Sequence, residues 1–492
     1  MDKTQMTALI IILLYMAATI IIGLVVSNKK KKEAVTQSKE DFLMAGKSLG
    51  PFVLAGTLFA ANTGGASTTG IATNVYKFGL SASWYVIAAG IGFVLVSFIA
   101  PYFRRTASNT VPEIIRKRYG KPSHIFTAIT SIAALFMATG AQIIATASII
   151  NVVTGLDFQT AAIVSTVVVI LYTMFGGFTS VAAANLMHLL FITIGMGIAT
   201  IIVITSKEVG GFANLFAQAK TVTDSAGQNL NLTSMTKIGL PVTIGYIAMY
   251  FMTFPTGQEI VQTYSSAKDG ATAKLGSVIA GIISAAFAII PALLGLVAYT
   301  FIDGLALEGI QKNALALATL TFAPAWVAGL VLAAIVAATM SSASGNMIGT
   351  ATMFTNDIFT PYINGGVKDD KKEVAVSKIT MLVVGVVGLL IALKASNIIS
   401  VMMGAFTLRS AGPFAAFICG IFYKDVTERA GFLAIIAGTI GAGVWIYGLK
   451  TPWGLSAIVP GSIVAFIVIF AVSAIDKSLG HPPAPPLELS DD

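Results

Sequence analysis

The sequence has too few charged residues for a soluble protein of its length. Asp, Glu, Lys and Arg make up 11% of the 492 residues, against about 25% in soluble domains, and 56% of the residues are hydrophobic. The single cysteine, Cys419, excludes an intramolecular disulfide. The three histidines, at 124, 188 and 481, lack metal-ligand spacing, and there is no glycine-rich nucleotide-binding loop. The composition therefore predicts an integral membrane protein and disfavours both an enzyme and an ATP-driven pump.

Long apolar runs recur along the whole chain. Thirteen of them are long enough to span a bilayer as helices. They cover approximately residues 7–27, 50–75, 80–103, 124–151, 159–177, 181–206, 239–262, 272–301, 320–346, 377–394, 397–422, 430–449 and 455–475. No loop between them is long enough for a soluble domain. The expected fold class is an all-α membrane protein with about 13 transmembrane helices.

The distribution of Lys and Arg predicts the orientation. With the N-terminus outside, 21 of the 30 basic residues lie on the cytoplasmic side, 8 lie on the other side and Arg409 lies within a span. This bias predicts a multi-pass protein of the cell membrane with a cytoplasmic C-terminus. The net charge of +8 then reflects topology, so the expected surroundings are the lipid bilayer, with no nucleic-acid partner. The Pro-rich, acidic tail is expected to be disordered.

Two of the runs are interrupted at mid-membrane depth. The second run contains "FAANTGGAST" (59–68), and the seventh contains "YFMTFPTGQEIVQ" (250–262) with Pro255 and Gly257. Irregular backbone at this depth is tolerated only where it lines a cavity or is buried in protein. Breaks in helices 2 and 7 divide helices 2–6 and 7–11 into two sets of opposite orientation, the pattern of an inverted-repeat transporter. The alternative is that these glycines and prolines only pack helices.

This pattern divides the chain into six parts. They are an extra N-terminal helix with a basic loop (1–49), a first inverted repeat (50–206), an extracytoplasmic loop (207–238), a second inverted repeat (239–423), two C-terminal helices (424–475) and a cytoplasmic tail (476–492).

Five segments, in order, resemble the sodium:solute symporter family. They are "DFLMAGKSLGPFVLAGTLFAAN" (41–62), "TVPEIIRKRYG" (110–120), "LYTMFGGFTS" (171–180), "MSSASGNMIGTATMFTNDIF" (340–359) and "PFAAFICGIFYKDVTERAGFLAIIAG" (413–438). The resemblance implies a leucine-transporter-like fold with one extra helix at the N-terminus and more at the C-terminus. It also implies Na⁺-driven uptake of a small organic solute by alternating access, with Na⁺ as the coupling ion.

A sodium site is expected between helices 2 and 9. Ala338, Ser341 and Ser342 are spaced so that they share one face of helix 9, and the two serines offer hydroxyl oxygens. The break in helix 2 is expected to free carbonyl groups near Ala60 and Thr63. The resemblance places the family's shared sodium site on the same five positions. The alternative for the two serines is helix packing by small residues.

A second ion site occurs in some members of the family and uses an Asp in helix 6. The matching position here is Asn185, in "VAAANLMH". An amide can donate an oxygen but lacks the charge, so one coupled Na⁺ is expected.

The solute pocket is expected where the two broken helices meet helix 11. The candidate residues are Asn62, Gly64, Gly65, Ser67, Thr253, Phe254, Gln258 and Met403. In the proline carriers an Asp takes the place of Asn62 and an aromatic residue that of Ala66; in the galactose carriers a Glu–Gln pair replaces Ala66 and Ser67. Neither set is present. The solute therefore stays open, with a carboxylate such as an amino acid or organic acid as one option.

Arg409 is the unusual charged residue, because it lies near mid-depth of helix 11. A charge there costs roughly 2.5–3.5 kcal/mol and is by default a functional hypothesis. It could bind a solute carboxylate, or it could form a structural or gating pair with Glu259 or Asp357. The sequence favours the second interpretation without choosing the carboxylate.

Other functional classes remain as alternatives. A proton-coupled symporter of the same fold would need an intramembrane carboxylate near the site, for which Glu259 is the only candidate. A non-transporting membrane sensor on this fold would carry a C-terminal signalling domain. A channel would show repeated filter motifs and needs no paired breaks.

Overall fold

The computed structural model describes residues 2–33, 49–106, 108, 110–395 and 397–487. Within these ranges the chain is almost entirely helical, with no strand and only two isolated bridges, Leu49–Ala267 and Thr223–Asn229. Each of the thirteen apolar ranges overlaps a helix. Seven helices of the described ranges are long and apolar enough to cross a membrane, or eight if one bent pair forms a single span. The number of crossings therefore stays a prediction.

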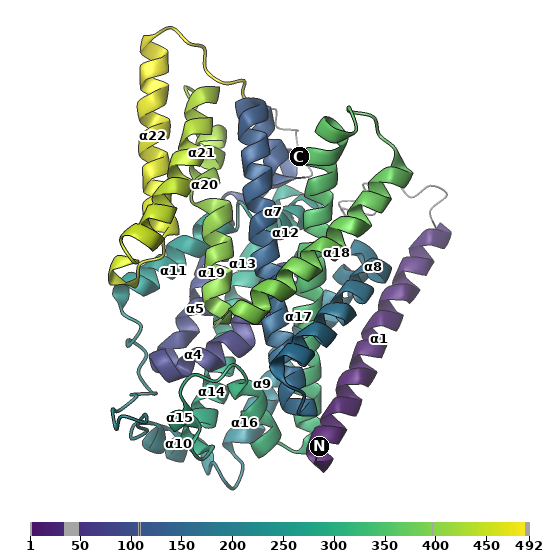
Figure 1. The fold of residues 1–492 in the computed structure, drawn as a ribbon, viewed down its shortest axis with the longest axis vertical. Coiled ribbons are helices and arrows are strands. Elements are labelled where there is room, and N and C mark those ends of the chain that lie inside the picture. Colours follow the sequence, from purple (N-terminus) through teal and green to yellow (C-terminus); the bar gives the residue numbers. More distant parts are fainter. Residues whose placement is uncertain (1, 34–48, 107, 109, 396, 488–492) are drawn as a thin grey trace.

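The first half of the chain forms the purple and blue helices of Figure 1. They are α1 (Lys3–Glu33), α3 (Pro51–Asn62), η2 (Ala66–Gly70), α4 (Ile71–Phe78), η3 (Gly79–Ser83), α5 (Trp84–Val96), α6 (Ala100–Arg105), α7 (Val111–Thr154), α8 (Phe158–Leu190), η4 (Phe191–Gly195), α9 (Met196–Ile204) and α10 (Gly211–Ala219).

The second half forms the teal, green and yellow helices. They are α11 (Leu240–Thr253), α12 (Gln258–Ser265), α13 (Gly270–Phe287), α14 (Ile289–Phe301), α15 (Leu305–Glu308), α16 (Ala314–Phe322), α17 (Ala325–Met353), η5 (Phe354–Ile363), α18 (Asp370–Lys394), α19 (Ile398–Ser410), α20 (Pro413–Phe422), α21 (Glu428–Gly443), η6 (Val444–Gly448), η7 (Pro452–Gly454) and α22 (Ile458–Ser478).

Both expected helix breaks are present. The second span stops at the end of α3 and resumes at η2, and the seventh stops at the end of α11 and resumes at α12. The backbone N–H of Leu49, just before α3, donates to the carbonyl of Ser266, and that of Lys268 donates to the carbonyl of Leu49, both at 3.1 Å. The chain entering α3 thus lies beside the chain leaving α12. The two broken spans therefore run in opposite directions, as an inverted arrangement requires.

Helices α7 and α17 form the centre of the molecule, along its long axis (Figure 1). α17 contacts α1, α7, α8 and α18 and is buried along nearly its whole length. α7 contacts α17, α18 and α19. α17 also contacts α3 and α12, and α7 contacts η2 and α12, so both long helices touch each of the two broken spans.

Two helix boundaries differ from those expected. The range 104–123 was expected to be a loop, but α7 begins at Val111, because Thr110 caps it by accepting a hydrogen bond from the N–H of Glu113 at 3.1 Å. Gly120, with φ of 74°, then kinks the helix. The ranges 159–177 and 181–206 were expected as separate spans, but the backbone is helical without a break from Phe158 to Leu190.

The start of α1 and the end of α22 lie at opposite ends of the molecule. α1 begins at the lower end in Figure 1, whereas α22 ends at the upper end. From there residues 481–487 run back toward α7, and the N–H of Ala484 donates to the carbonyl of Val426, between α20 and α21, at 2.7 Å. The buried guanidinium of Arg118 donates to the carbonyls of Ala484 and Pro485.

The expectation of a disordered tail is therefore wrong for residues 481–487. The reason is that a proline-rich segment keeps free carbonyl groups, which a buried guanidinium needs as acceptors. Residues 488–492 lie outside the described chain.

Candidate functional site

A small cavity, here called the ion cavity, lies between α3, α12 and α17. Three of the five candidate sodium ligands line it, namely Ala60, Ser341 and Ser342. Ser342 Oγ donates to the carbonyl oxygen of Ala60 at 3.5 Å, which joins the end of α3 to α17. The other two candidates, Thr63 and Ala338, do not line this cavity but are buried within one turn of residues that do.

The break after α3 leaves polar atoms without helical partners. The N–H of Gly64 would bond to Ala60 O in a continuous helix, but here it donates to Asn62 O at 3.3 Å. Thr63 is fully buried, and its hydroxyl has no hydrogen-bond partner within the described part of the chain. Buried polar atoms are nearly always paired, so these oxygens are candidate ligand atoms. A hard cation such as Na⁺ binds oxygen ligands, and neutral oxygens suffice for its single charge.

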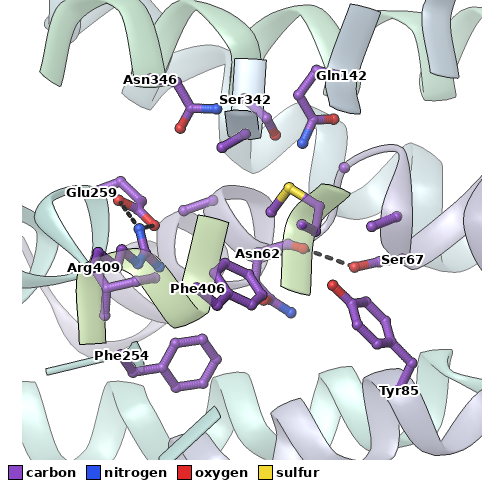
Figure 2. A pocket seen from close by; sticks show the side chains of 16 residues that line it. Asn62, Ser67, Tyr85, Gln142, Phe254, Glu259, Ser342, Asn346, Phe406 and Arg409 are labelled. Carbon is purple, nitrogen blue, oxygen red and sulfur yellow. Dashed lines mark hydrogen bonds and ion pairs between the residues drawn. The ribbon is translucent and has the colours of Figure 1, made fainter. Parts of the chain in front are cut away.

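A second cavity, here called the solute cavity, adjoins the first. It is lined by Ala61, Asn62, Gly64, Ala66, Ser67, Tyr85, Ala138, Gln142, Phe254, Glu259, Ile260, Ser342, Asn346, Met402, Phe406 and Arg409 (Figure 2). Four of the eight candidate solute residues are among these, namely Asn62, Gly64, Ser67 and Phe254. Ser67 Oγ donates to Asn62 O at 2.8 Å, and this bond links the end of α3 to η2 across the break.

The other four candidates do not line the solute cavity. The N–H of Gly65 donates to Gln142 Oε1 at 2.8 Å. Thr253 supports Arg409, and Gln258 Oε1 accepts from the N–H of Val111 at 3.1 Å, which holds α12 to α7. Met402 lines the cavity in place of Met403, a difference of one residue in the rotation of α19.

Arg409 resolves the choice between two carboxylates. Its Nη1 lies 2.8 Å and 3.0 Å from the two carboxylate oxygens of Glu259, and its Nε donates to Thr253 Oγ1 at 2.9 Å. The guanidinium carbon lies 5.0 Å from the centre of the Phe406 ring. The pair borders the solute cavity (Figure 2).

Asp357 has other partners. One of its carboxylate oxygens lies 3.0 Å from His124 Nε2 and accepts from Thr110 Oγ1 at 3.1 Å. This cluster joins η5 to the beginning of α7. Asp357 is therefore not the partner of Arg409.

Comparison with known proteins decides the family. The sodium:solute symporter family matches residues 42–438. The chain belongs to this family. It is therefore a membrane transporter that couples solute movement to sodium, and not an enzyme.

Relatives of this symporter include two curated bacterial proteins. It is 25% identical over 467 residues to the osmoregulated proline transporter OpuE of Bacillus subtilis (strain 168), with 90% of each chain covered. It is 26% identical over 480 residues to a sodium/proline symporter of Staphylococcus aureus, with 90% of this chain and 89% of the relative covered.

Two solved structures share the symporter's fold. One is a Na⁺-coupled sialic acid symporter in a substrate-bound outward-open state, with a TM-score of 0.77 and 20% identity over 98% of both chains. The other is MhsT in complex with L-phenylalanine, with a TM-score of 0.51 and 15% identity over 86% of this chain and 98% of that one. The leucine-transporter-like fold expected from the sequence is thus confirmed.

Two polar residues of the symporter's solute cavity escaped the sequence analysis. Gln142 of α7 and Asn346 of α17 face the cavity from the side opposite Phe254 and Tyr85 (Figure 2). Each is an amide within a long apolar helix, in "MATGAQIIATA" and "SASGNMIG". That isolation in an apolar helix is the signal that could have found them, because intramembrane polar groups need partners. The side chain of Asn185 lies outside the described residues.

Proposed function

We propose that this symporter uses the Na⁺ gradient to import a small solute that carries a carboxylate, such as an amino acid or an organic acid. The observation that carries the proposal is the donor chemistry of the solute cavity. Arg409 supplies a guanidinium, and the side-chain nitrogen of Asn62 is a buried donor without a partner among the described residues. Both groups donate hydrogen bonds, and a guanidinium pairs well with a carboxylate.

The compared proteins support a carboxylate solute. The two curated relatives are named for proline, and the sialic acid symporter is named for sialic acid. Both molecules carry a carboxylate but differ widely in the rest of their structure. Because Asn62 and Ala66 differ from the residues of the proline carriers, the proposal stops at the carboxylate and does not extend to proline.

We assign the coupling ion to Ala60, Thr63, Ala338, Ser341 and Ser342. This assignment is supported by the cavity beside Ala60, Ser341 and Ser342 and by the unpaired hydroxyl of Thr63. An ion held there would join the broken α3 to the long helix α17. Its loss would loosen that contact and favour opening toward the cytoplasm, and it can bias the two states only through different affinities for them.

A ligand screen tests the proposed solute class. Purified protein is heated with members of a metabolite library in NaCl and, separately, in KCl at equal ionic strength. We expect carboxylates to raise the midpoint of unfolding in NaCl only, because ligands that bind the folded state stabilise it by mass action. Stabilisation by compounds without an anionic group, with none from carboxylates, would contradict the proposed solute class.

The proposed orientation has the N-terminus outside the cell and the C-terminus in the cytoplasm. The bias of basic residues and the opposite positions of α1 and the end of α22 support it. Reporters inserted in the 207–238 loop and after residue 487 should read extracytoplasmic and cytoplasmic, respectively. The reverse pattern would overturn the orientation.

A further inference from the structure

Glu259 occupies the wall between the two cavities. Its side chain lines both the ion cavity and the solute cavity, whereas Arg409 lines the solute cavity alone. The Glu259 side chain is 20% exposed and that of Arg409 is 4% exposed. The carboxylate can therefore be reached from the ion cavity without displacing the arginine.

Arg409 is fixed in place by neighbours other than Glu259. Thr253 Oγ1 accepts from its Nε, and the ring of Phe406 packs against the guanidinium. Gly257 contacts the remaining side so closely that a Cβ atom there would lie 2.8 Å from Nη2. The arginine is thus anchored on three sides, and Nη1 is the group that it presents to Glu259.

We propose that Glu259 is a shared partner of Arg409 and of a Na⁺ in the ion cavity, so that Na⁺ binding frees Arg409 for the carboxylate of the solute. In the absence of Na⁺ the Glu259 carboxylate neutralises the guanidinium. A Na⁺ beside Ser342 draws that carboxylate toward itself, and the anchored guanidinium then faces the solute cavity with its charge uncompensated. This inference rests on the proposed function and extends it to the mechanism of coupling.

Charge balance makes the exchange cooperative. The Arg409–Glu259 pair is neutral, and either a Na⁺ or an anionic group added alone would leave one uncompensated charge in a poorly solvated site, which is costly. Adding both restores neutrality. Na⁺ should therefore raise the affinity for a carboxylate, and by linkage the carboxylate should raise the affinity for Na⁺ by the same factor.

The test compares the Na⁺ affinity of two single variants. The midpoint of thermal unfolding is measured against NaCl concentration, with KCl keeping the ionic strength constant. Glu259→Gln removes the charge that attracts the ion, so it should raise the half-saturating Na⁺ concentration by about tenfold. Arg409→Gln removes the competitor for Glu259, so it should lower that concentration by about fivefold. Shifts of opposite sign are the signature, because a purely structural ion pair would weaken Na⁺ binding from either side.

A matched control is available in another arginine–carboxylate pair. Arg429 Nη1 lies 3.4 Å from Asp476 Oδ1, and neither residue lines either cavity. Arg429→Gln should leave the half-saturating Na⁺ concentration unchanged. If Arg409→Gln fails to fold, Arg409→Lys takes its place, since a lysine lacks the Nε–H that Thr253 holds and so should pair less firmly with Glu259 and also lower that concentration.

The outcomes separate the two proposals. A wild-type protein that Na⁺ stabilises no better than K⁺ would contradict the proposed sodium site. A wild-type protein that responds to Na⁺, with both single variants shifted in the same direction or not at all, would overturn the role of Glu259 and leave the sodium site standing.

Discussion

The two broken spans differ in the groups that lie beside the break. At the break after α3, the carbonyl of Ala60 accepts from the neutral hydroxyl of Ser342, and the hydroxyl of Thr63 and the side-chain nitrogen of Asn62 have no partner among the described residues. At the break after α11, the guanidinium of Arg409 already fills the gap beside Gly257. The break after α3 keeps polar atoms available to a ligand, whereas a charged side chain of the protein itself lies beside the break after α11. An unwound helix is thus not by itself a binding site; what matters is which atoms remain unpaired.

The largest expected effect is on Na⁺ dependence, when the hydroxyl groups that α17 contributes to the proposed sodium site are removed. Replacing Ser341 and Ser342 together by Ala removes two hydroxyls with little change in volume. We expect the protein to fold, but NaCl should no longer raise its unfolding midpoint over KCl, and Na⁺ should no longer stimulate uptake at millimolar concentrations. Undiminished Na⁺ dependence would mean that the ion binds elsewhere and that the glycines after Asn62 serve packing.

Glycine substitutions compare how closely neighbouring atoms pack against the backbone at the two breaks. A Cβ at Gly65 would lie 2.1 Å from the Cβ of Ala145, whereas one at Gly257 would meet the side chain of Arg409 at 2.8 Å. Gly65→Ala should therefore destabilise the protein by about 1–3 kcal/mol, and Gly257→Ala by less, because its closest contact, at 2.8 Å, is less severe.

Gly443 is the matched control for these variants. It lies in α21 and lines neither cavity, and a Cβ added there would meet no atom of a neighbouring element within 4 Å, so Gly443→Ala should be neutral or stabilising. Thermal unfolding midpoints rank the three variants. Equal losses at positions 65 and 257 would erase the proposed difference between the breaks.

Gln142 provides a smaller test of the first break. Its Oε1 accepts from the N–H of Gly65, so Gln142→Met would leave a buried donor unpaired, at a cost of about 1–3 kcal/mol. Gln311→Met is the control, because that amide bonds to an exposed Glu308. The unfolding midpoint should fall for Gln142→Met and stay within error for Gln311→Met. A fall of the same size in both midpoints would show that the hydrogen bond to Gly65 contributes no more to stability than the exposed bond does.

The smallest expected effect concerns a second sodium ion. The family resemblance places Asn185 where some members have an Asp, so we expect one coupled Na⁺ and a Hill slope near 1 for the Na⁺ dependence of uptake. Asn185→Ala should leave that slope unchanged. A slope near 2 that falls in the variant would show that the amide completes a second site.

The sequence predicted the broken helices because glycine and proline act locally. It predicted the shared face of Ser341 and Ser342 because helical spacing is fixed. It could not choose between Glu259 and Asp357 as the partner of Arg409, since that depends on how separate helices pack; His124 and Thr110 in fact hold Asp357. The sequence predicted Met403 in the solute cavity, but Met402 lines it, because the rotation of α19 about its axis is set by packing.

The contact of Arg118 with the C-terminal segment has a consequence for the order of synthesis. The carbonyl of Ala484 lies 366 residues downstream of the guanidinium that it accepts from. At roughly 5–20 residues per second, the ribosome needs about 20–70 s to make that stretch. Throughout this time the start of α7 is already made, yet its arginine lacks these acceptors. The end of α7 that carries Arg118 therefore reaches its final state only when nearly the whole chain has been translated.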